Sequence, residues 1–337
     1  MEIGRKERRM IKKKENKILA FAAILLIVAS AAPGQSSSAQ PTVTASRAFQ
    51  LTGYTQILYK HDWKSGSDGF QVRRARLGLS GEIAKNINFK FLFEGAKTPY
   101  LIDAQVEVAF SKKLTLRFGQ FKVPFSLESY TSTSDLDTVN RSQVVDKLSP
   151  GRDIGASGRD IGAMVCVKYS IAEVNVGLLN GSGINKADTD KHKDVVSRVV
   201  LAPLAWLQVG ASVYDGEVTT SSGPARRDRT GLDVALSRGD FSFKGEYIAA
   251  TDARIRTNGW YAQAGYFIVP KQVQAILKFD SFDKNRDAGS DRSDVLTVGV
   301  NWFFTSKTKL QINYERIRLE TGKVLGNSLL VQFQAGF

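Results

Sequence analysis

The chain has 337 residues, and its 47 Lys and Arg outnumber its 33 Asp and Glu to give a formal net charge of +14. Its single cysteine, Cys166, excludes an intrachain disulfide, so the chain is not a small secreted domain held together by disulfides. A basic chain points to nucleic acid, an anionic surface or an anionic ligand as its partner.

Residues 1–39 predict a secretory signal peptide. A front rich in Lys and Arg precedes the apolar run 18–29, and small residues follow it. A transmembrane anchor needs about 17 to 25 apolar residues, and this run is shorter. Cleavage after Ala31 or after Ala39 satisfies the small-x-small rule. Residues 1–31 carry a net +5, so the mature chain keeps +9, and export makes nucleic acid the weakest of the three partner classes.

From about residue 47 onward, apolar and polar residues alternate, which is typical of β-strands with one apolar face. In the run INFKFLFE, residues 87–94, Ile and three Phe share one face, and mostly polar residues share the other. Runs of about ten residues are long enough for a tilted strand to cross hydrocarbon. About sixteen such runs are predicted, at residues 48–60, 69–83, 87–96, 101–110, 113–121, 158–169, 172–180, 194–202, 206–215, 229–237, 240–250, 257–268, 271–281, 293–304, 308–319 and 328–337.

The connections between these runs alternate between tight turns and longer loops rich in Gly, Ser and Asp. This alternation, with an even strand count, is typical of an outer-membrane barrel, in which closure pairs every backbone group. We therefore predict that residues 40–337 form an all-β domain, a transmembrane antiparallel β-barrel of about 16 strands. A large soluble sandwich would also alternate, but it does not account for the last strand. That strand, SLLVQFQAGF, ends on Phe337 and resembles the signal read by the barrel-assembly machinery.

If the apolar face of each strand meets lipid, the other face points into the barrel, because a charge on the lipid side costs about 2 to 4 kcal/mol at the midplane. In QVRRARLGLSGEI, Ala75 and Leu77 mark the lipid face, which turns Arg74 and Arg76 inward. For any single cation, a structural ion pair with a neighbouring strand is an equal alternative. The further residues predicted to face inward are Lys90, Arg117, Lys168, Arg198, Lys244 and Lys278, with the acids Glu94, Asp103, Glu107, Glu173, Asp233 and Glu246.

The connection from Lys122 to Ser157 is too long for a turn, and loops of this length are usually functional. Guanidinium groups suit phosphate because their planar fork donates two hydrogen bonds at once. Several weak sites in series at a constriction would let an anion bind and then move on. The cations of this connection are Lys122, Arg141, Lys147 and Arg152.

The hexapeptide GRDIGA occurs twice, at residues 151–156 and 158–163. Glycines permit a sharp path where the chain leaves the long connection and re-enters the wall. We interpret the repeat as a short duplication that lengthens this hinge; contact of its arginines with anions is the alternative. The residues expected to pin the loop base are Arg152, Asp153, Arg159 and Asp160.

Five segments together resemble the phosphate-selective porin O and P family. They are RRARLGLSG, LRFGQFKVPFSLE, SPGRDIG, YAQAGYFI and LTVGVNWFFTSKTKLQINYE. The resemblance spans about residues 50–337 and implies a sixteen-stranded barrel, usually a homotrimer. It also implies an inward-folded long third loop and a pore selective for phosphate or polyphosphate. Arg74 and Arg76 match the basic strand motif of the family.

From alternation and resemblance together, we predict a set of anion-binding or pore-lining residues. This set is Arg74, Arg76, Lys90, Arg117, Lys122, Arg141, Lys147, Lys168, Arg198 and Lys278.

The predicted function is a passive diffusion channel with an anion preference in the outer membrane of a Gram-negative bacterium, and phosphate or polyphosphate is the expected solute. The alternatives are a general non-selective porin and a surface protein that forms no channel. An enzyme is disfavoured because the only histidines, His61 and His192, fall in predicted loops, and no Ser-His-acid order or metal-ligand spacing occurs. We expect no catalytic residue, cofactor, metal or nucleic-acid partner. The expected partners are small anions, outer-membrane lipid, further copies in a homotrimer and the barrel-assembly machinery.

The predicted strand 308–319 loses its alternation between Tyr314 and Ile317. A β-bulge and the exit of the chain from the membrane would each explain the slip. Arg316 and Arg318 therefore stay unassigned.

Overall fold

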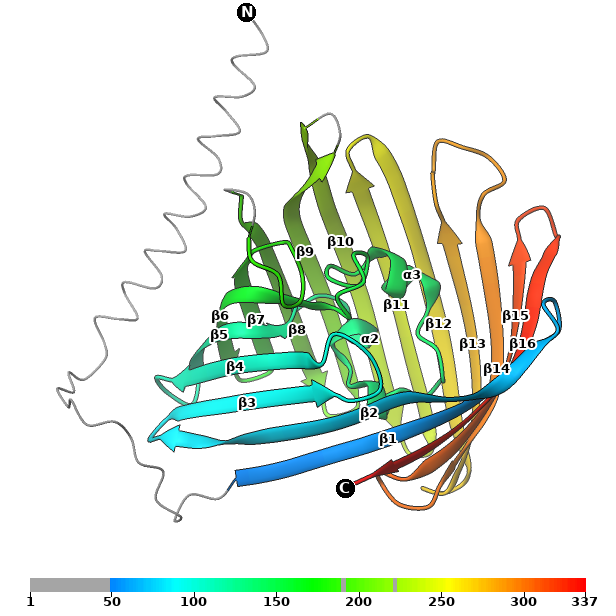
Figure 1. Ribbon diagram of the computed structural model, residues 1–337, viewed down its shortest axis with the longest axis horizontal. Coiled ribbons are helices and arrows are strands. Elements are labelled where there is room, and N and C mark those ends of the chain that lie inside the picture. The colour runs from blue at the N-terminus through cyan, green and yellow to red at the C-terminus, as the bar shows by residue number, and fades with distance from the viewer. Residues whose placement is uncertain (1–48, 189–191, 221–222) are drawn as a thin grey trace, which may run out of the picture.

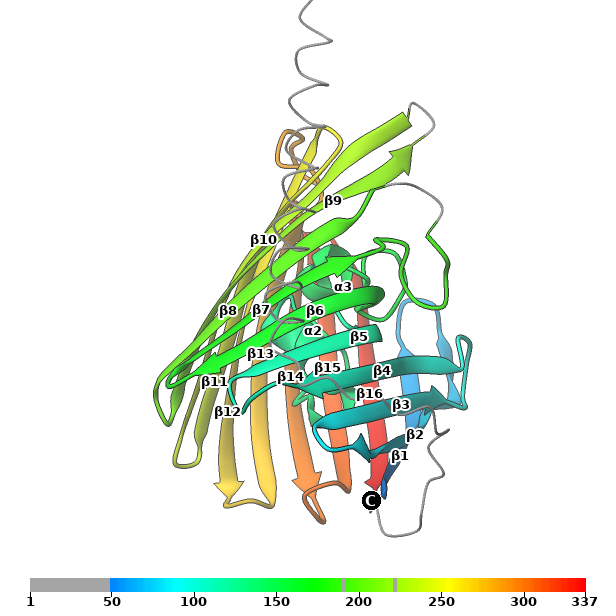
Figure 2. The same cartoon turned by 90° about the vertical axis from the view of Figure 1, so that its left-hand side faces the viewer.

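The computed structural model describes residues 49–337 apart from 189–191 and 221–222, and the predicted signal peptide lies outside this part of the chain. The described residues form a closed antiparallel barrel in which β16 pairs with β1 (Figure 1 and Figure 2). The prediction of an all-β barrel of about sixteen strands is confirmed. The strands are β1 Phe49–Asp62, β2 Ser67–Ala84, β3 Ile87–Glu94, β4 Leu101–Ala109, β5 Leu114–Lys122, β6 Arg159–Tyr169, β7 Ala172–Leu179, β8 Asp194–Leu204, β9 Leu207–Thr220, β10 Gly223–Arg238, β11 Phe241–Asp252, β12 Ile255–Val269, β13 Val273–Asp283, β14 Ser293–Phe303, β15 Lys309–Leu319 and β16 Val324–Gly336.

The outer face of the barrel is apolar, with aromatic rings toward both ends. At the end of the short turns, Trp302 and Phe304 stack with their ring centroids 5.3 Å apart. Toward the other end, Trp63 meets Tyr314 edge to face at 5.8 Å. Aromatic girdles at both interfaces are typical of outer-membrane barrels. Large apolar side chains exposed between these ends include Phe91, Phe93, Leu232, Leu277 and Val298.

The hairpin of β9 and β10 departs most from the predicted spans. The predicted loop at residues 216–228 is wrong, because β9 continues to Thr220 and β10 begins at Gly223. The ladder is regular there and pairs Gly216 with Arg227. Both faces of this stretch carry polar residues, so it lacks the apolar alternation by which a strand is recognised.

A β-bulge in β2 changes which residues face the lumen. The register shifts between Gln56 and Ile57, which pair with Arg74 and Val72, so Arg73 is the extra residue. Arg73 donates to Gln332 and Asn140 inside the barrel, at 3.2 and 2.7 Å. The bulge therefore turns two consecutive arginines, Arg73 and Arg74, toward the interior.

Three short helices interrupt the connection between β5 and β6, residues 123–158, which we call the L3 segment. They are α2 Leu127–Tyr130, η1 Thr133–Asp135 and α3 Gln143–Leu148. No helix in the described part of the chain is long and apolar enough to cross a membrane.

Candidate functional site

The L3 segment packs against strands from one side of the barrel. Its helix α3 contacts β11, β12 and β13, and Figure 1 shows α2 and α3 within the ring of strands. Burying a Val or Phe side chain contributes about 1.5 to 3 kcal/mol, so several together attach the segment firmly. The buried cluster at this contact includes Phe125, Val144, Val145 and Leu148 of the segment and Ile248, Ala250, Tyr261 and Phe282 of the strands.

Two glycines in the wall make room for this contact. A Cβ atom at Gly231 would lie 3.1 Å from the Phe125 ring, and one at Gly259 would lie 2.9 Å from a Val144 methyl carbon. Larger residues at these two places on β10 and β12 would push the segment away from the wall. The local sequence of both strands therefore fits the position of the L3 segment.

Buried polar groups also hold the segment. Glu246 of β11 accepts from the backbone N–H groups of Leu127 and Glu128, at 3.0 and 2.5 Å. Glu128 lies 3.4 Å from Lys278 of β13 and accepts two hydrogen bonds from Ser142. Burial opposes the charge of Glu128, but Lys278, Arg141 and Ser142 outweigh it, so the pKa of Glu128 lies below its ordinary value.

The two copies of GRDIGA have different partners. Asp153 of the first copy accepts from Arg227 at 2.6 Å and from Arg229 at 2.9 Å, both on β10. In the second copy, Arg159 donates to Asp103 at 2.9 Å. Asp160 accepts backbone N–H bonds from Ile161, Gly181 and Gly183. Arg152 donates to Ser129 at 2.8 Å and lies 3.3 Å from Asp146.

Most of the cations predicted to face inward are ion-paired. The buried Arg198 makes two hydrogen bonds to Asp233, at 2.6 and 2.9 Å. The other pairs are Arg76 with Glu94 at 3.0 Å, Lys90 with Asp103 at 3.5 Å, Arg117 with Glu107 at 2.6 Å, Lys168 with Glu173 at 3.1 Å, and Lys244 with Asp137 at 2.6 Å. For these residues the ion-pair alternative describes the observed contacts.

A smaller group of cations has no carboxylate within 4.0 Å among the described residues: Arg73, Arg74, Lys97, Lys122 and Arg141. Arg74 donates to the Gln56 side-chain oxygen at 2.8 Å. Lys122 donates to the carbonyls of Tyr130 and Thr131, at 2.8 and 3.0 Å. Arg141 donates to the carbonyls of Glu128 and Thr131. These acceptors are neutral, so Arg74, Lys122 and Arg141 form no direct ion pair among the described residues.

The charges of this group act on one another. Partial burial, together with Arg74, Arg76 and Arg73, lowers the pKa of Lys97, although Glu94 acts in the opposite direction. Burial also lowers the pKa of Arg141, and Arg76 contributes to this shift although Glu128 acts in the opposite direction. Repulsion between like charges disfavours the protonated forms. A cationic patch therefore connects β2, the loop at residues 95–100 and the L3 segment.

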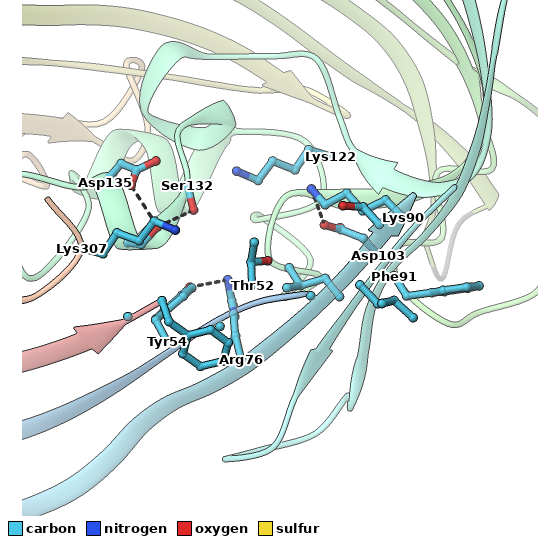
Figure 3. Close-up of a pocket in the computed structure, with 18 of the residues that line it drawn as sticks. Thr52, Tyr54, Arg76, Lys90, Phe91, Asp103, Lys122, Ser132, Asp135 and Lys307 are labelled. Carbon is cyan, nitrogen blue, oxygen red and sulfur yellow. Dashed lines mark hydrogen bonds and ion pairs between the residues drawn. The ribbon is translucent and has the colours of Figure 1, made fainter. Parts of the chain in front are cut away.

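The patch adjoins a cavity of about 290 Å³ between β1–β4 and the L3 segment. Figure 3 shows Arg76, Lys90 and Lys122 around this space, with Lys307 on its opposite side. Thr52, Tyr54 and Ser132 add hydroxyl groups to the lining. Cations and hydroxyl groups that converge on one space can replace part of the hydration shell of an anion.

Two predicted lining residues lie away from this patch. Lys147 is exposed on α3. Lys168 is 67% exposed beside the short turn after β6, and it pairs with Glu173. Alternation does not identify Arg73 or Lys97 as members of this patch. A pair of consecutive arginines in a membrane strand is a usable signal, because a lipid-facing arginine is so costly that a bulge is the cheaper solution.

One of the two histidines lies in a strand. His61 lies in β1 and not in a loop, which corrects the prediction, and His192 lies 3.6 Å from Asp194. Within the described residues, no group of three His, Cys, Asp or Glu side chains could hold a metal ion.

A closed barrel with an apolar outer face and a charged interior is typical of channel proteins of the outer membrane. Residues 50–215 and 210–324 match the family described as phosphate-selective porin O and P. The chain belongs to this family and is an outer-membrane porin of a Gram-negative bacterium. Family and fold are those of a channel rather than an enzyme.

Solved structures share the fold at low sequence identity. The anion-selective porin from Comamonas acidovorans has a TM-score of 0.66 and 15% identity, covering 86% of this chain and 100% of that one. The outer membrane channel DcaP of Acinetobacter baumannii has a TM-score of 0.63 and 11% identity, covering 91% and 100%. OmpT of Vibrio cholerae in its trimer form has a TM-score of 0.63 and 12% identity, covering 86% and 99%. No curated protein matches the chain.

Proposed function

We propose that this porin is a passive diffusion channel with an anion preference, and that phosphate or polyphosphate is its preferred solute. The observation that carries the proposal is the patch of Arg73, Arg74, Lys97, Lys122 and Arg141, cations without a carboxylate within 4.0 Å among the described residues. Unpaired positive charge in a narrow space of low dielectric raises the local concentration of anions and lowers that of cations.

Phosphate is favoured over chloride by the geometry of the donors. A guanidinium group presents a planar fork that matches two oxygens of one phosphate. Arg73 and Arg74 supply two such groups at neighbouring positions of β2, and the bulge turns both inward. Their present acceptors, the side chains of Gln56, Gln332 and Asn140, are neutral, and a doubly charged anion competes well with them.

A general porin without selectivity is the second candidate, and the ion pairs favour it. Arg76, Arg117 and Arg198 each bond to a carboxylate, so they contribute little net field to the lumen. Selectivity in the first candidate depends on the unpaired cations alone. Removal of the unpaired cations should therefore lower the anion preference of a selective channel and leave a general porin unchanged.

We also propose that the channel is a homotrimer. The strands β3, β4 and β5 have only 8, 9 and 9 residues, whereas β9 and β10 have 14 and 16. At about 3.3 Å per residue and a tilt of about 45°, eight residues rise only about 19 Å, which is less than the apolar band of about 25 Å. Figure 1 shows β1–β5 strongly inclined. A protein partner suits this short wall better than lipid, and a second copy would cover its outward Phe89, Phe91 and Phe93.

The test is the reversal potential of refolded protein in a planar bilayer under a potassium chloride gradient, followed by addition of phosphate. The proposal predicts a reversal potential of anion-selective sign and a block of the chloride current by phosphate. A channel with no ion preference would leave the general porin. Protein that folds but opens no channel would contradict both candidates. Cross-linking in detergent tests the trimer separately.

A further inference from the structure

Two arginines lie on the outer face of β15 near its extracellular end. Arg316 pairs across the ladder with Leu296, and Tyr314 pairs with Val298. Leu296 and Val298 are exposed on the apolar outer face. Directly paired residues point to the same side of a sheet. Arg318, two residues beyond Arg316, shares this face. The register between β15 and β16 shifts at Ile317 and Arg318, but the extra residue, Leu325, lies in β16, so the alternation of β15 continues through both arginines.

Their height along the barrel corresponds to the lipid headgroups. Trp302 belongs to the aromatic girdle at the end of the short turns, and it pairs with Leu310 of β15. Arg318 lies eight residues beyond Leu310 along the same strand. Eight residues at about 3.4 Å each and a tilt of about 40° rise about 21 Å, close to the apolar band of about 25 Å. Arginine side chains also extend toward water at such interfaces. The guanidinium groups therefore reach the layer of charged headgroups.

Neither arginine forms an ion pair within the described part of the chain. Asp294 lies directly opposite Arg318 in the ladder, but no carboxylate lies within 4.0 Å of either guanidinium group, and Arg292 lies 3.6 Å from both Asp294 and Glu320. The Nε atom of Arg316 is buried and has no hydrogen-bond partner within the protein. A buried guanidinium nitrogen without a partner costs free energy, which a ligand oxygen would recover once a side-chain rotation exposes the nitrogen.

Aromatic side chains lie next to the arginines. Trp63 is 52% exposed and meets Tyr314 edge to face at 5.8 Å. The backbone N–H of Trp63 donates to the Asn327 carbonyl, and Asn327 pairs with Arg316 across the ladder. Tyr and Trp side chains are enriched where acyl chains meet headgroups. The two rings and the two arginines thus form one amphipathic surface at the outer edge of the membrane.

We propose that Arg316 and Arg318 bind the phosphate groups of lipopolysaccharide in the outer leaflet. Each guanidinium donates a planar pair of hydrogen bonds to phosphate oxygens, and Trp63 and Tyr314 contact the sugar and the start of the acyl chains. The site faces away from the lumen. It depends on the outer-membrane location of the protein and not on the proposed anion selectivity, so either proposal can fail without the other.

The test measures binding of bisphosphorylated lipid A to refolded protein in detergent by native mass spectrometry. We expect the R316Q/R318Q variant to bind at least about tenfold more weakly, because hydrogen bonds from charged donors to phosphate are lost. The matched control is R226Q/R256Q, which removes two exposed arginines that already pair with Asp228 and Asp287. This control should bind lipid A as the wild type does. Lipid A without phosphates should bind equally weakly to the wild type and to both variants.

Equal lipid A binding by R316Q/R318Q and the wild type would overturn the proposal. Inorganic phosphate that competes with lipid A at equal concentration would show a site for free phosphate instead. Loss of the oligomer with unchanged lipid A binding would show an interface with another copy of the chain. If R316Q/R318Q does not fold, R316K/R318K keeps the charge, loses the planar fork and should bind with intermediate affinity.

Discussion

Inward arginines occur in two different states in this barrel: Arg198 and Arg76 are ion-paired, whereas Arg74 bonds to a neutral group. On the β8–β13 side, which the L3 segment contacts, Arg198 is buried and makes two hydrogen bonds to Asp233. On the β2 side, Arg74 bonds only to the neutral side chain of Gln56. Pairing satisfies a buried charge locally, whereas an unpaired charge acts on whatever ion enters the lumen. The number of lumen arginines therefore says less about selectivity than the number of them that lack a carboxylate partner.

The largest effect is expected from detaching the L3 segment from its wall. Phe125 is fully buried against Gly231, and Phe125→Ala should remove about 3 to 5 kcal/mol of packing. Single-channel conductance should rise and ion preference should fall, because the segment would no longer face the β2 arginines at a fixed distance. The lipid-facing control Phe279→Ala, on β13 and away from the proposed trimer wall, should leave both unchanged. Wild-type conductance in Phe125→Ala would show that the segment does not narrow the pore.

Arg198→Gln tests the paired side. It leaves the buried Asp233 without its cation, so the free energy of unfolding in lipid vesicles should fall by about 3 to 5 kcal/mol. Ion preference should stay as in the wild type, because the pair contributes little field. The double variant R198M/D233L should recover much of the stability. A large change in the reversal potential of Arg198→Gln, without loss of stability, would show that the paired arginine sets the ion preference.

Arg74→Gln should weaken the block by phosphate and leave the free energy of unfolding unchanged, which is the opposite of the result expected for Arg198→Gln. One unpaired charge about 4 Å from a permeating ion is worth about 1 kcal/mol at a dielectric close to that of bulk water, or about fivefold in binding. The phosphate concentration that blocks half of the chloride current should rise by about this factor. Unfolding stability should not fall, because Arg74 makes no ion pair among the described residues. An unchanged blocking concentration would remove Arg74 from the phosphate path.

The smallest effect is expected from pH. The pKa of Glu128 lies below its ordinary value, so its contribution to anchoring the L3 segment is complete above the unfolded pKa of about 4.5. That contribution is lost only as pH falls through the lower, folded value. The titration of Glu128 should therefore cause no step in single-channel conductance between pH 8 and pH 5. A step in conductance within that range that is absent in Glu128→Gln would contradict this assignment.

The strands were predictable because lipid imposes a strict rule on one face of every span. Departures from regular alternation were not predictable at the same level. The bulge in β2 turns Arg73 inward, and a register shift between β3 and β4 at Ile102 lets this apolar residue pack against Ala156 and Ile184. Side-chain partners far apart in sequence, such as Arg227 and Asp153, depend on how the L3 segment folds. Alternation therefore predicts whether a side chain points to lipid or to the lumen, but its ion-pair partner is known only from the three-dimensional structure.

One measurement tests the central claim that unpaired cations set the ion preference. It compares the reversal potentials of two variants that each remove two positive charges, R73Q/R74Q and K168Q/K244Q, under the same potassium chloride gradient. Lys168 and Lys244 pair with Glu173 and Asp137, whereas Arg73 and Arg74 bond to neutral groups. We predict that R73Q/R74Q loses most of the anion preference and that K168Q/K244Q keeps it. Equal shifts in the two variants would contradict the claim and show that net charge alone decides.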